Sequence, residues 1–159
     1  MMDTLEAIRT RRVAKSYGDE AVQPELLRSV IEAARWAPSA SNVRVQRYVP
    51  VTDPAALRLI EMFSPGMVAG RPAALVIICI DRTIADYEAP IPTRRELYWD
   101  VGSAAQNMLL AAHAQGLVAG PMTTDAPSAL RVFLDLPDSL DPQLMIGIGH
   151  RVPAVTAAP

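Results

Sequence analysis

The sequence predicts an α+β fold in which helices cover a central sheet, and three observations support this prediction. Apolar residues recur at helical spacing in several segments. The continuous apolar run Ala73–Ile80 has the β-branched composition of a strand that is buried on both faces. The order of predicted helices and strands is neither the regular alternation of a doubly wound fold nor an all-β pattern. A length of 159 residues with 50% hydrophobic residues suits one domain over residues 1–159.

The first half of the chain is predicted to form three helices and one strand. Leu5 and Ile8 lie three residues apart, which indicates a short amphipathic helix. Pro24 suits the first turn of a second helix, and Pro38 ends it by disfavouring helical geometry in the preceding residue. The predicted elements are a helix over Thr4–Thr10, a helix from Pro24 that ends before Pro38, a strand over Arg47–Thr52, and a helix from Asp53-Pro54 to Phe63 that ends at Pro65-Gly66.

The second half is predicted to hold the central strand and a long buried helix. The stretch Val101–Ala114 is apolar nearly all round, so a helix there must be covered on every side. A small domain rarely covers such a helix alone, which suggests a partner subunit. The predicted elements are a strand over Ala73–Ile80, a surface loop or lid over Asp81–Pro92, a helix over Thr93–Gln115 capped by Gly116, a strand over Leu117–Met122, a helix over Pro127–Leu134 and a strand over Leu144–Ile148.

Charge and composition argue against several classes of protein. The 15 Lys and Arg residues against 17 Asp and Glu residues give a net charge of −2, so no strongly positive field is present to hold nucleic acid. The longest apolar run, Pro72–Ile80, is far shorter than the roughly 20 residues that span a bilayer. The single cysteine, Cys79, forbids an internal disulfide, and the two histidines show no zinc-binding spacing. With no targeting segment visible, we expect a cytoplasmic protein without a metal, a membrane or a nucleic-acid partner.

Common catalytic motifs are absent from the sequence. Gly147-Ile-Gly149 lacks the third glycine and the following helix of a dinucleotide-binding loop, and neither a nucleophile elbow nor a Walker loop occurs. Cys79 lies in a predicted buried strand, where a thiol is normally inert packing. His113 lies on the long apolar helix, where a core or interface role is more frequent than a ligand role, and His150 could serve either role.

Two segments carry residues that could bind a ligand. Arg11, Arg12 and Lys15 follow the first helix and suit a phosphate or an anionic ring edge, although a solvated charge cluster has the same composition. In Ala34–Asn42 the helix breaks at Pro38 into small hydroxyl and amide side chains. Such side chains can hydrogen-bond an aromatic heterocycle, and they also make ordinary turns and caps. Each segment taken alone favours the ordinary structural explanation.

Taken together, in this order and spacing, the two segments resemble the FMN-dependent nitroreductase family. Three further stretches agree: Ala73–Asp81 is similar to the family's apolar central strand, Asp100–Ala112 to its long dimer helix, and Gly116-Leu117 to the end of that helix. The similarity covers most of the chain. It implies a nitroreductase-like fold with a central mixed or antiparallel sheet covered by helices, and a homodimer with FMN in two active sites shared between the subunits.

The resemblance also implies a chemistry and a set of cofactor-binding residues. NAD(P)H would reduce FMN at N5, and an electron-poor small molecule such as a nitroaromatic or a quinone would take the electrons, with no side-chain nucleophile. The resemblance implies that the FMN phosphate and the pyrimidine edge of the flavin contact Arg11, Arg12, Val13 and Lys15, and that Arg151 also contacts the phosphate. It implies that the flavin bound by the other subunit contacts Pro38, Ser39, Ala40, Ser41 and Asn42. It also implies that flavin N5 faces the backbone of Gly120–Thr124, which includes Pro121, Met122 and Thr123. Lys15 or Arg11 would stabilise the anionic reduced flavin.

The chain departs from the family pattern at several of these positions. Val13 stands where the family has a serine, and Arg44-Val45 replaces a Gln-Pro pair. Pro65–Ala69 offers no polar side chain before the central strand, and the chain is short for the family. These departures leave two alternatives to a nitroreductase-type enzyme: a flavin-binding member of the superfamily with different chemistry, and a non-catalytic dimeric flavin carrier.

Overall fold

A computed structural model describes residues 2–64, 70–85, 94–124 and 126–152. Most of the predicted elements are present within a few residues of their expected bounds. In chain order the elements are α1 (Thr4–Thr10), α2 (Pro24–Arg35), η1 (Ala40–Asn42), β1 (Gln46–Val51), α3 (Pro54–Phe63), β2 (Ala74–Asp81), α4 (Arg82–Ala85), α5 (Arg94–Ala114), β3 (Val118–Met122), α6 (Pro127–Phe133) and β4 (Leu140–Gly149).

The four strands form one sheet in the order β1-β2-β4-β3, and every neighbouring pair is antiparallel. β2 is a central strand, as the sequence predicts, and its residues Ala74 to Cys79 have no exposed surface. β1 and β3 are the two outer strands of the sheet. An isolated parallel bridge joins Val13 to Ala119 in β3, so the chain after α1 runs along that edge.

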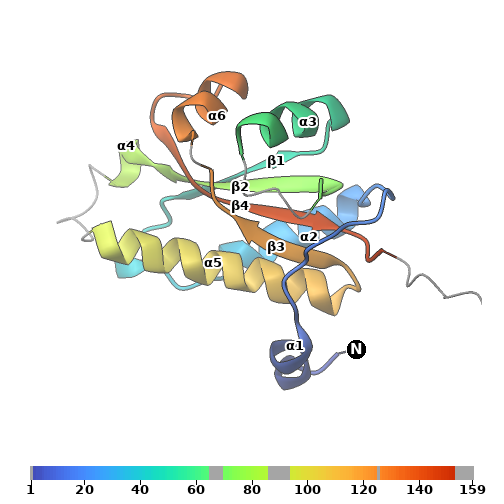
Figure 1. Ribbon diagram of the computed structural model, residues 1–159. Coiled ribbons are helices and arrows are strands. Elements are labelled where there is room, and N and C mark those ends of the chain that lie inside the picture. Colours follow the sequence, from blue (N-terminus) through green and yellow to red (C-terminus); the bar gives the residue numbers. More distant parts are fainter. Residues whose placement is uncertain (1, 65–69, 86–93, 125, 153–159) are drawn as a thin grey trace, which may run out of the picture.

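Helices cover both faces of the sheet (Figure 1). On one face, α2 and α5 pack against Val76 and Ile78 of β2 and Ile146 of β4. On the other face, α3, α6 and the Tyr17 ring pack against Leu75 and Ile77 of β2. Successive residues of a strand point to opposite faces, so the continuous apolar sequence of β2 supplies both cores. The α+β prediction with a helix-covered sheet is therefore confirmed.

Two elements differ from the sequence predictions. β4 begins at Leu140, four residues before the predicted Leu144, because Asp141 and Pro142 pair with the end of β2 across a register irregularity between Ile78 and Cys79. The predicted lid over residues 81–92 is wrong at its start. Asp81 closes β2 and residues 82–85 form the short helix α4, while the remainder of that stretch lies outside the described residues.

The long helix α5 is buried on one side only. Val101, Ala104 and Met108 face the sheet, whereas Tyr98 is 58% exposed and Trp99 is 67% exposed. Within the stretch 101–114, Gly102, Gln106 and Ala114 are also exposed in the single chain. This is the uncovered side for which the sequence suggests a partner subunit. None of the helices in the described residues is long and apolar enough to cross a membrane.

Candidate functional site

A pocket of about 300 Å³ lies beside the outer edge of β3, and cations line it. Arg12, Lys15 and Ser16 reach it from the segment after α1, and Arg151 reaches it from the end of β4. We call this the cation pocket. No Asp or Glu lies among its lining residues in the described part of the chain. The two predicted sources of positive charge, Arg12 and Lys15 near the start of the chain and Arg151 near its end, therefore meet at one place.

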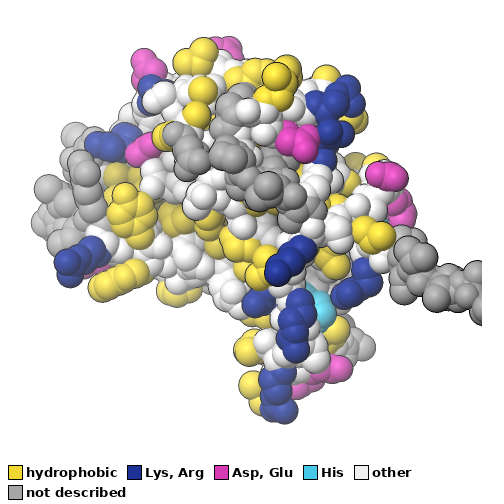
Figure 2. All heavy atoms as spheres, in the orientation of Figure 1, with side chains coloured by type: hydrophobic (Ala, Val, Ile, Leu, Met, Phe, Trp, Pro, Cys, Tyr) yellow, Lys and Arg dark blue, Asp and Glu magenta, His cyan; other side chains and the backbone are white. Residues whose placement is uncertain are grey.

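Backbone pairing brings these distant segments together. The Ala14 N–H donates to the Ala119 carbonyl oxygen at 2.9 Å, and the Gly18 N–H donates to the His150 carbonyl oxygen at 2.9 Å. The residues after α1 therefore run along β3 and then along the end of β4. Figure 2 shows Lys and Arg side chains gathered over α1 and the segment that follows it.

Arg11 is the C-cap residue of α1, and its guanidinium group is partly buried without a partner. Its Nε and Nη1 atoms are inaccessible to solvent, and they have no hydrogen-bond partner within the described residues. Leaving buried donors unpaired costs about 1–3 kcal/mol, and more when the group is charged. Arg12 differs, because its Nη1 donates to the Arg9 and Arg11 carbonyl oxygens at 2.8 and 3.0 Å and so holds the end of α1. Within the described residues, Arg11 is thus a cation without an anionic partner.

Val13 lines the cation pocket and is 47% exposed. Val13 stands where the family has a serine, so this departure from the family pattern lies at the pocket. A valine can offer the pocket an apolar surface but no hydroxyl hydrogen bond.

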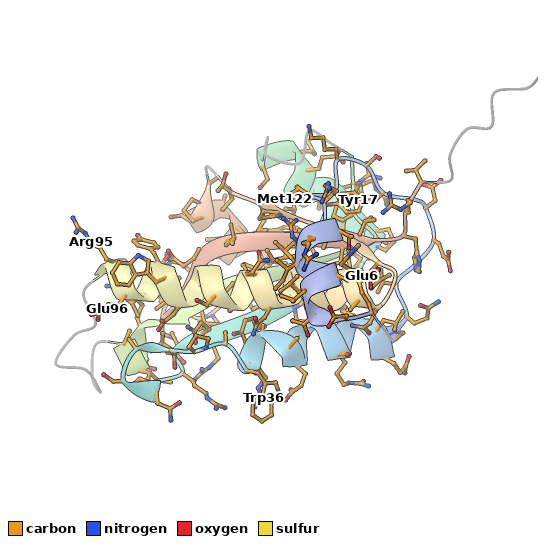
Figure 3. The ribbon with its side chains drawn as sticks, turned by 90° about the horizontal axis from the view of Figure 1, so that it is seen from below. Glu6, Tyr17, Trp36, Arg95, Glu96 and Met122 are labelled. Atoms are coloured by element: carbon orange, nitrogen blue, oxygen red, sulfur yellow. The ribbon has the colours of Figure 1, made fainter. Side chains whose placement is uncertain are left out.

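Tyr17 lies beneath the backbone of β3 and β4. A side chain at Gly147 would come within 2.7 Å of the Tyr17 hydroxyl, and one at Gly149 within 3.0 Å of the Tyr17 ring. The two glycines of Gly147-Ile-Gly149 thus make room for a tyrosine, which the sequence motif alone did not reveal. The Tyr17 hydroxyl has no hydrogen-bond partner in the described part of the chain, and burial raises the Tyr17 pKa to about 12. Figure 3 labels Tyr17 and Met122 close to each other.

Gly120–Thr124, the segment predicted to face the flavin N5, lies at the end of β3. Gly120 gives the chain a close approach here, because a Cβ there would lie 3.0 Å from the Ala14 carbonyl oxygen and 3.2 Å from the Tyr17 hydroxyl. Met122 is buried, whereas Pro121 and Thr123 are exposed.

Ser64 anchors the end of this segment. Its hydroxyl, which has no exposed surface, donates to Thr124 Oγ1 at 3.2 Å, and the same oxygen accepts from the Ala126 N–H at 3.1 Å. Sequence reasoning missed Ser64. Its only signal is a hydroxyl residue placed directly after the apolar end of α3.

The second predicted segment, Pro38–Asn42, lies against the N-terminal half of α5. The Ala40 N–H donates to Asp100 Oδ2 at 3.0 Å, and Ser41 and Asn42 adopt left-handed φ angles of 52° and 57°. Burial raises the pKa of Asp100, and the charge of Glu96 adds to this effect, while the hydrogen bond from Ala40 opposes it. Sequence reasoning missed this carboxylate, whose signal is an acidic residue at the border of an apolar helix.

An open pocket of about 620 Å³ adjoins Pro38 along α5, where Tyr98, Trp99 and Gln106 line it. Nearby, the Asn107 side-chain amide donates to the Ala33 carbonyl oxygen at 3.1 Å and so ties α5 to α2. Among the described residues, its lining offers aromatic rings and amides and no Lys or Arg. It is therefore chemically distinct from the cation pocket.

The two predicted groups of site residues do not meet within one chain. Asp100 of α5 holds the 38–42 segment, while His113 of α5 hydrogen-bonds Thr10 of α1 at 2.8 Å. A helix rises about 1.5 Å per residue, so these attachment points are roughly 20 Å apart. Figure 1 shows α1 near the C-terminal end of α5 and the chain that follows α2 near its other end.

Among the described residues, no group of three or more His, Cys, Asp and Glu side chains is placed to hold a metal ion. Cys79 is fully buried in β2, and burial raises its pKa to about 12, so its thiol stays protonated at neutral pH.

The fold and the sequence both match one family of proteins. The family model for the nitroreductase family matches residues 8–76 and 64–150. A protein of Methanothermobacter thermautotrophicus, provisionally named an NADH dehydrogenase/NAD(P)H nitroreductase, is 33% identical over an alignment 159 residues long, which covers 94% of this chain and 78% of that protein. The chain belongs to the nitroreductase family.

Solved structures agree with this assignment. A protein of Desulfovibrio desulfuricans, provisionally described as a nitroreductase and solved in complex with FMN, is 28% identical with a TM-score of 0.83, and the match covers 100% of this chain and 92% of that chain. A protein of Parabacteroides distasonis, provisionally named an NADH dehydrogenase/NAD(P)H nitroreductase, is 27% identical with a TM-score of 0.83, over 100% of this chain and 93% of that chain.

Proposed function

We propose that this protein is an FMN-dependent oxidoreductase that transfers hydride from NAD(P)H through FMN to an electron-poor small molecule, such as a nitroaromatic or a quinone. Membership of the nitroreductase family makes it an NAD(P)H-dependent oxidoreductase. The observation that supports FMN as the cofactor is the cation pocket. Arg11, which directly precedes the lining residue Arg12, adds a buried guanidinium group that is unpaired within the described residues. The proposal takes residues 1–159 as one FMN-binding domain that works in the cytoplasm.

The residues of the cation pocket fit the phosphate of FMN. Arg12, Lys15 and Arg151 line the pocket, and Ser16 adds a hydroxyl. Guanidinium groups bind phosphate oxygens in paired, charge-assisted hydrogen bonds. Arg11 does not line the pocket. Its Nε and Nη1 have no partner within the described residues, and a phosphate bound next to it would supply an anionic one. The FMN complex of the Desulfovibrio desulfuricans relative supports this choice of cofactor.

The chain's own residues would bind and orient the cofactor. FMN supplies the redox chemistry when bound, by accepting a hydride equivalent and passing it to the acceptor. Lys15 or Arg11 would stabilise negative charge on the reduced ring, because a fixed cation is most useful where charge develops during the reaction. The backbone of Gly120–Thr124, anchored by the Ser64–Thr124 hydrogen bond, would present N–H groups to the ring.

The active sites would be shared between two subunits of a homodimer. Within one chain Pro38–Asn42 and Arg11–Lys15 lie near opposite ends of α5. Two copies of α5 packed antiparallel would bring the 38–42 segment of one subunit to the cation pocket of the other. Such packing would also cover Tyr98 and Trp99 on α5, and Leu5 and Ile8 on α1, which are half or more exposed in the single chain.

The experiment that tests this function is an anaerobic visible absorption spectrum of the protein with FMN, recorded before and after addition of NADH or NADPH. Bound flavin that bleaches rapidly is the expected result. The Arg11→Ala variant should bind FMN more weakly by about 2–3 kcal/mol, since a charge-assisted hydrogen bond contributes about that much. Arg9→Ala, an exposed residue of the same helix, is the matched control. Unchanged flavin affinity in Arg11→Ala would remove Arg11 from the site.

A second candidate function is that of a flavin-binding family member with different chemistry, and the apolar Val13 at the cation pocket favours it. The same spectra separate the two functions. Flavin that binds and does not bleach with either nucleotide would indicate a carrier or a flavoprotein with different chemistry. Absence of flavin binding would overturn both.

A further inference from the structure

A second cationic pocket lies on a different part of the molecule from the cation pocket. It has a volume of about 340 Å³ and lies between the C-terminal end of α2 and the start of the outer strand β1. Its lining includes Arg35 from α2 and Arg44, Arg47 and Tyr48 from the chain that enters β1. We call this the arginine pocket. The function proposed above does not use it.

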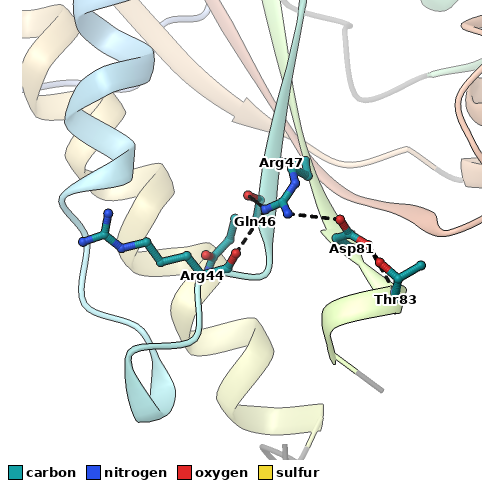
Figure 4. A network of polar contacts seen from close by, with 5 residues as sticks. All are labelled: Arg44, Gln46, Arg47, Asp81 and Thr83. Atoms are coloured by element: carbon teal, nitrogen blue, oxygen red, sulfur yellow. Dashed lines mark hydrogen bonds and ion pairs between the residues drawn. The ribbon is translucent and has the colours of Figure 1, made fainter. Parts of the chain in front are cut away.

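Arg47 is locked in place by a network of polar contacts (Figure 4). Its Nη2 lies 3.2 Å from Asp81 Oδ2, and its Nη1 donates to the Arg44 and Gln46 carbonyl oxygens at 3.1 Å each. Asp81 is itself held, because its Oδ1 accepts from the backbone N–H and the hydroxyl of Thr83. Arg47 therefore shapes the turn into β1, while its charge is partly balanced.

The positive charge of the pocket is not fully balanced by carboxylates. Arg35 Nη1 pairs with Glu32 Oε2 at 3.1 Å on the exposed surface of α2. Arg44 makes no ion pair with any residue in the described part of the chain, and Figure 4 shows its guanidinium pointing away from Arg47. No Asp or Glu lines the pocket in the described residues. In a chain whose net charge is −2, such a local excess of positive charge is suited to an anion.

An aromatic ring completes the pocket. The Tyr48 hydroxyl donates to the Ala34 carbonyl oxygen at 3.3 Å, which fixes the ring between β1 and α2. Burial raises the pKa of Tyr48, and the charges of Arg35 and Arg44 oppose that rise, so both guanidinium groups act on the same hydroxyl. Two cations close to an aromatic ring are suited to a ligand that joins phosphate to a heterocycle.

We propose that the arginine pocket binds a phosphate group on the ADP half of the nicotinamide nucleotide, and thereby selects the reductant. This proposal rests on the proposed function, in which the nicotinamide nucleotide is the reductant. Ala37 lines the pocket and directly precedes Pro38–Asn42, the segment proposed to approach the flavin. The ligand class follows from this adjacency and from the chemistry of the lining. Arg44 is the residue whose charge is free to bind.

The direct test is calorimetric titration of the FMN-saturated protein with adenosine 2′,5′-bisphosphate and, separately, with AMP. Bound FMN keeps these probes out of the cation pocket. Arg44→Gln is expected to weaken binding of the bisphosphate tenfold or more, and added salt should weaken binding to the unaltered protein. Arg28→Gln, an exposed residue of α2 outside the pocket, is the matched control and should bind like the unaltered protein. Equal binding by the Arg44→Gln variant overturns the proposal.

Steady-state kinetics identify which phosphate is bound. A KM for NADPH that rises about tenfold in Arg44→Gln, with kcat and the KM for NADH unchanged, assigns the pocket to the 2′-phosphate. A rise in both KM values assigns it to the pyrophosphate that the two nucleotides share, and overturns the role in selecting between NADPH and NADH. No change in either KM overturns the role in selecting the reductant. The failure of the proposed function is a separate result, because it appears as absent flavin binding or absent bleaching in the unaltered protein.

Discussion

Tyr17 shows what a single buried hydroxyl does in this fold. The ring packs against Gly147 and Gly149, and its oxygen lies 3.2 Å from where a Cβ of Gly120 would be. The oxygen has no hydrogen-bond partner among the described residues, and such an unpaired donor costs about 1–3 kcal/mol. The ring is therefore favoured by packing, and the hydroxyl is a local energetic cost.

We expect the Tyr17→Phe variant to be more stable than the unaltered protein by about 1 kcal/mol at pH 8, because the substitution removes an unpaired buried hydroxyl. The pH dependence follows from the raised pKa of about 12. The folded state favours the protonated phenol, so its contribution is fully present below the unfolded pKa near 10 and is lost as the pH rises toward 12. At pH 11 the advantage of phenylalanine should grow by about 1.4 kcal/mol.

Urea unfolding at pH 8 and at pH 11 measures both effects. Tyr98→Phe, at an exposed tyrosine of α5, serves as the control and should show neither. If Tyr17→Phe were less stable than the unaltered protein at pH 8, the hydroxyl would have a partner that stabilises it.

Among the elements, α5 connects the two parts of the candidate site. Asp100 near its N-terminal end accepts from the Ala40 N–H, and His113 near its C-terminal end contacts Thr10 of α1. The η1 turn carries left-handed φ angles at Ser41 and Asn42, a conformation that costs free energy in residues other than glycine. The Asp100–Ala40 hydrogen bond is the contact that holds this strained turn on the helix.

Substitutions of Asp100 separate its hydrogen bond from its charge. Asp100→Asn keeps an acceptor for the Ala40 N–H and removes a desolvated charge, so we expect equal or greater stability at pH 7. Asp100→Ala loses the acceptor and should be less stable by about 1 kcal/mol. Because the pKa of Asp100 is raised in the folded state, its contribution is fully present below the unfolded pKa and is lost as the pH rises through the folded pKa.

Unfolding by urea at pH 3 and at pH 7 tests this sign. The stability of the unaltered protein relative to Asp100→Asn should fall between the lower and the higher pH. Asp19→Asn, at an exposed residue, is the control. An Asn variant as unstable as the Ala variant at pH 7 would mean that the charge itself holds the turn.

The elements were predictable where local pattern decides them. The starts of α2, α3 and α6 have local signals: each helix begins with a proline, and Asp53 caps α3 by accepting from the Ala56 N–H. These helices begin within a residue or two of the positions that the sequence predicts. The start of β4 was missed because a strand containing Pro142 is identified only by its pairing partner, β2. The sequence predicted which types of residue form the candidate site. It did not predict Ser64 and Asp100, because each of them acts through a contact with a residue 60 positions away.

At the scale of the whole molecule, the exposed apolar residues of α5 lead us to expect a homodimer. We expect the protein to have twice the 17.2 kDa mass of one chain by light scattering, and Trp99→Glu to shift it toward the monomer. The reason is that a charge on this apolar face would be buried without a partner. Met62→Glu changes an exposed methionine of α3 on the other side of the sheet and should leave the dimer intact. If the unaltered protein were a monomer, the proposal that its active sites are shared between two subunits would be contradicted.

Mixed dimers extend this test to the sites themselves. Arg11→Ala alters the segment after α1, and Asn42→Ala alters the other predicted segment. In a mixed dimer of the two variants, one shared site carries both changes and the other carries neither. Mixing should therefore restore part of the flavin binding that each variant lacks alone, whereas sites built within single chains would show no recovery.

The sequence by itself determined the α+β class, the buried central strand, most helix boundaries and the residue types of the candidate site. These features depend on local spacing, proline and apolar periodicity, which residues near one another in the chain decide. The tertiary structure alone decided that Arg151 joins Arg12 and Lys15 at one pocket, that Tyr17 requires Gly147 and Gly149, and that an arginine pocket exists beside β1. These depend on strand pairing and helix packing between distant segments, which no local pattern encodes.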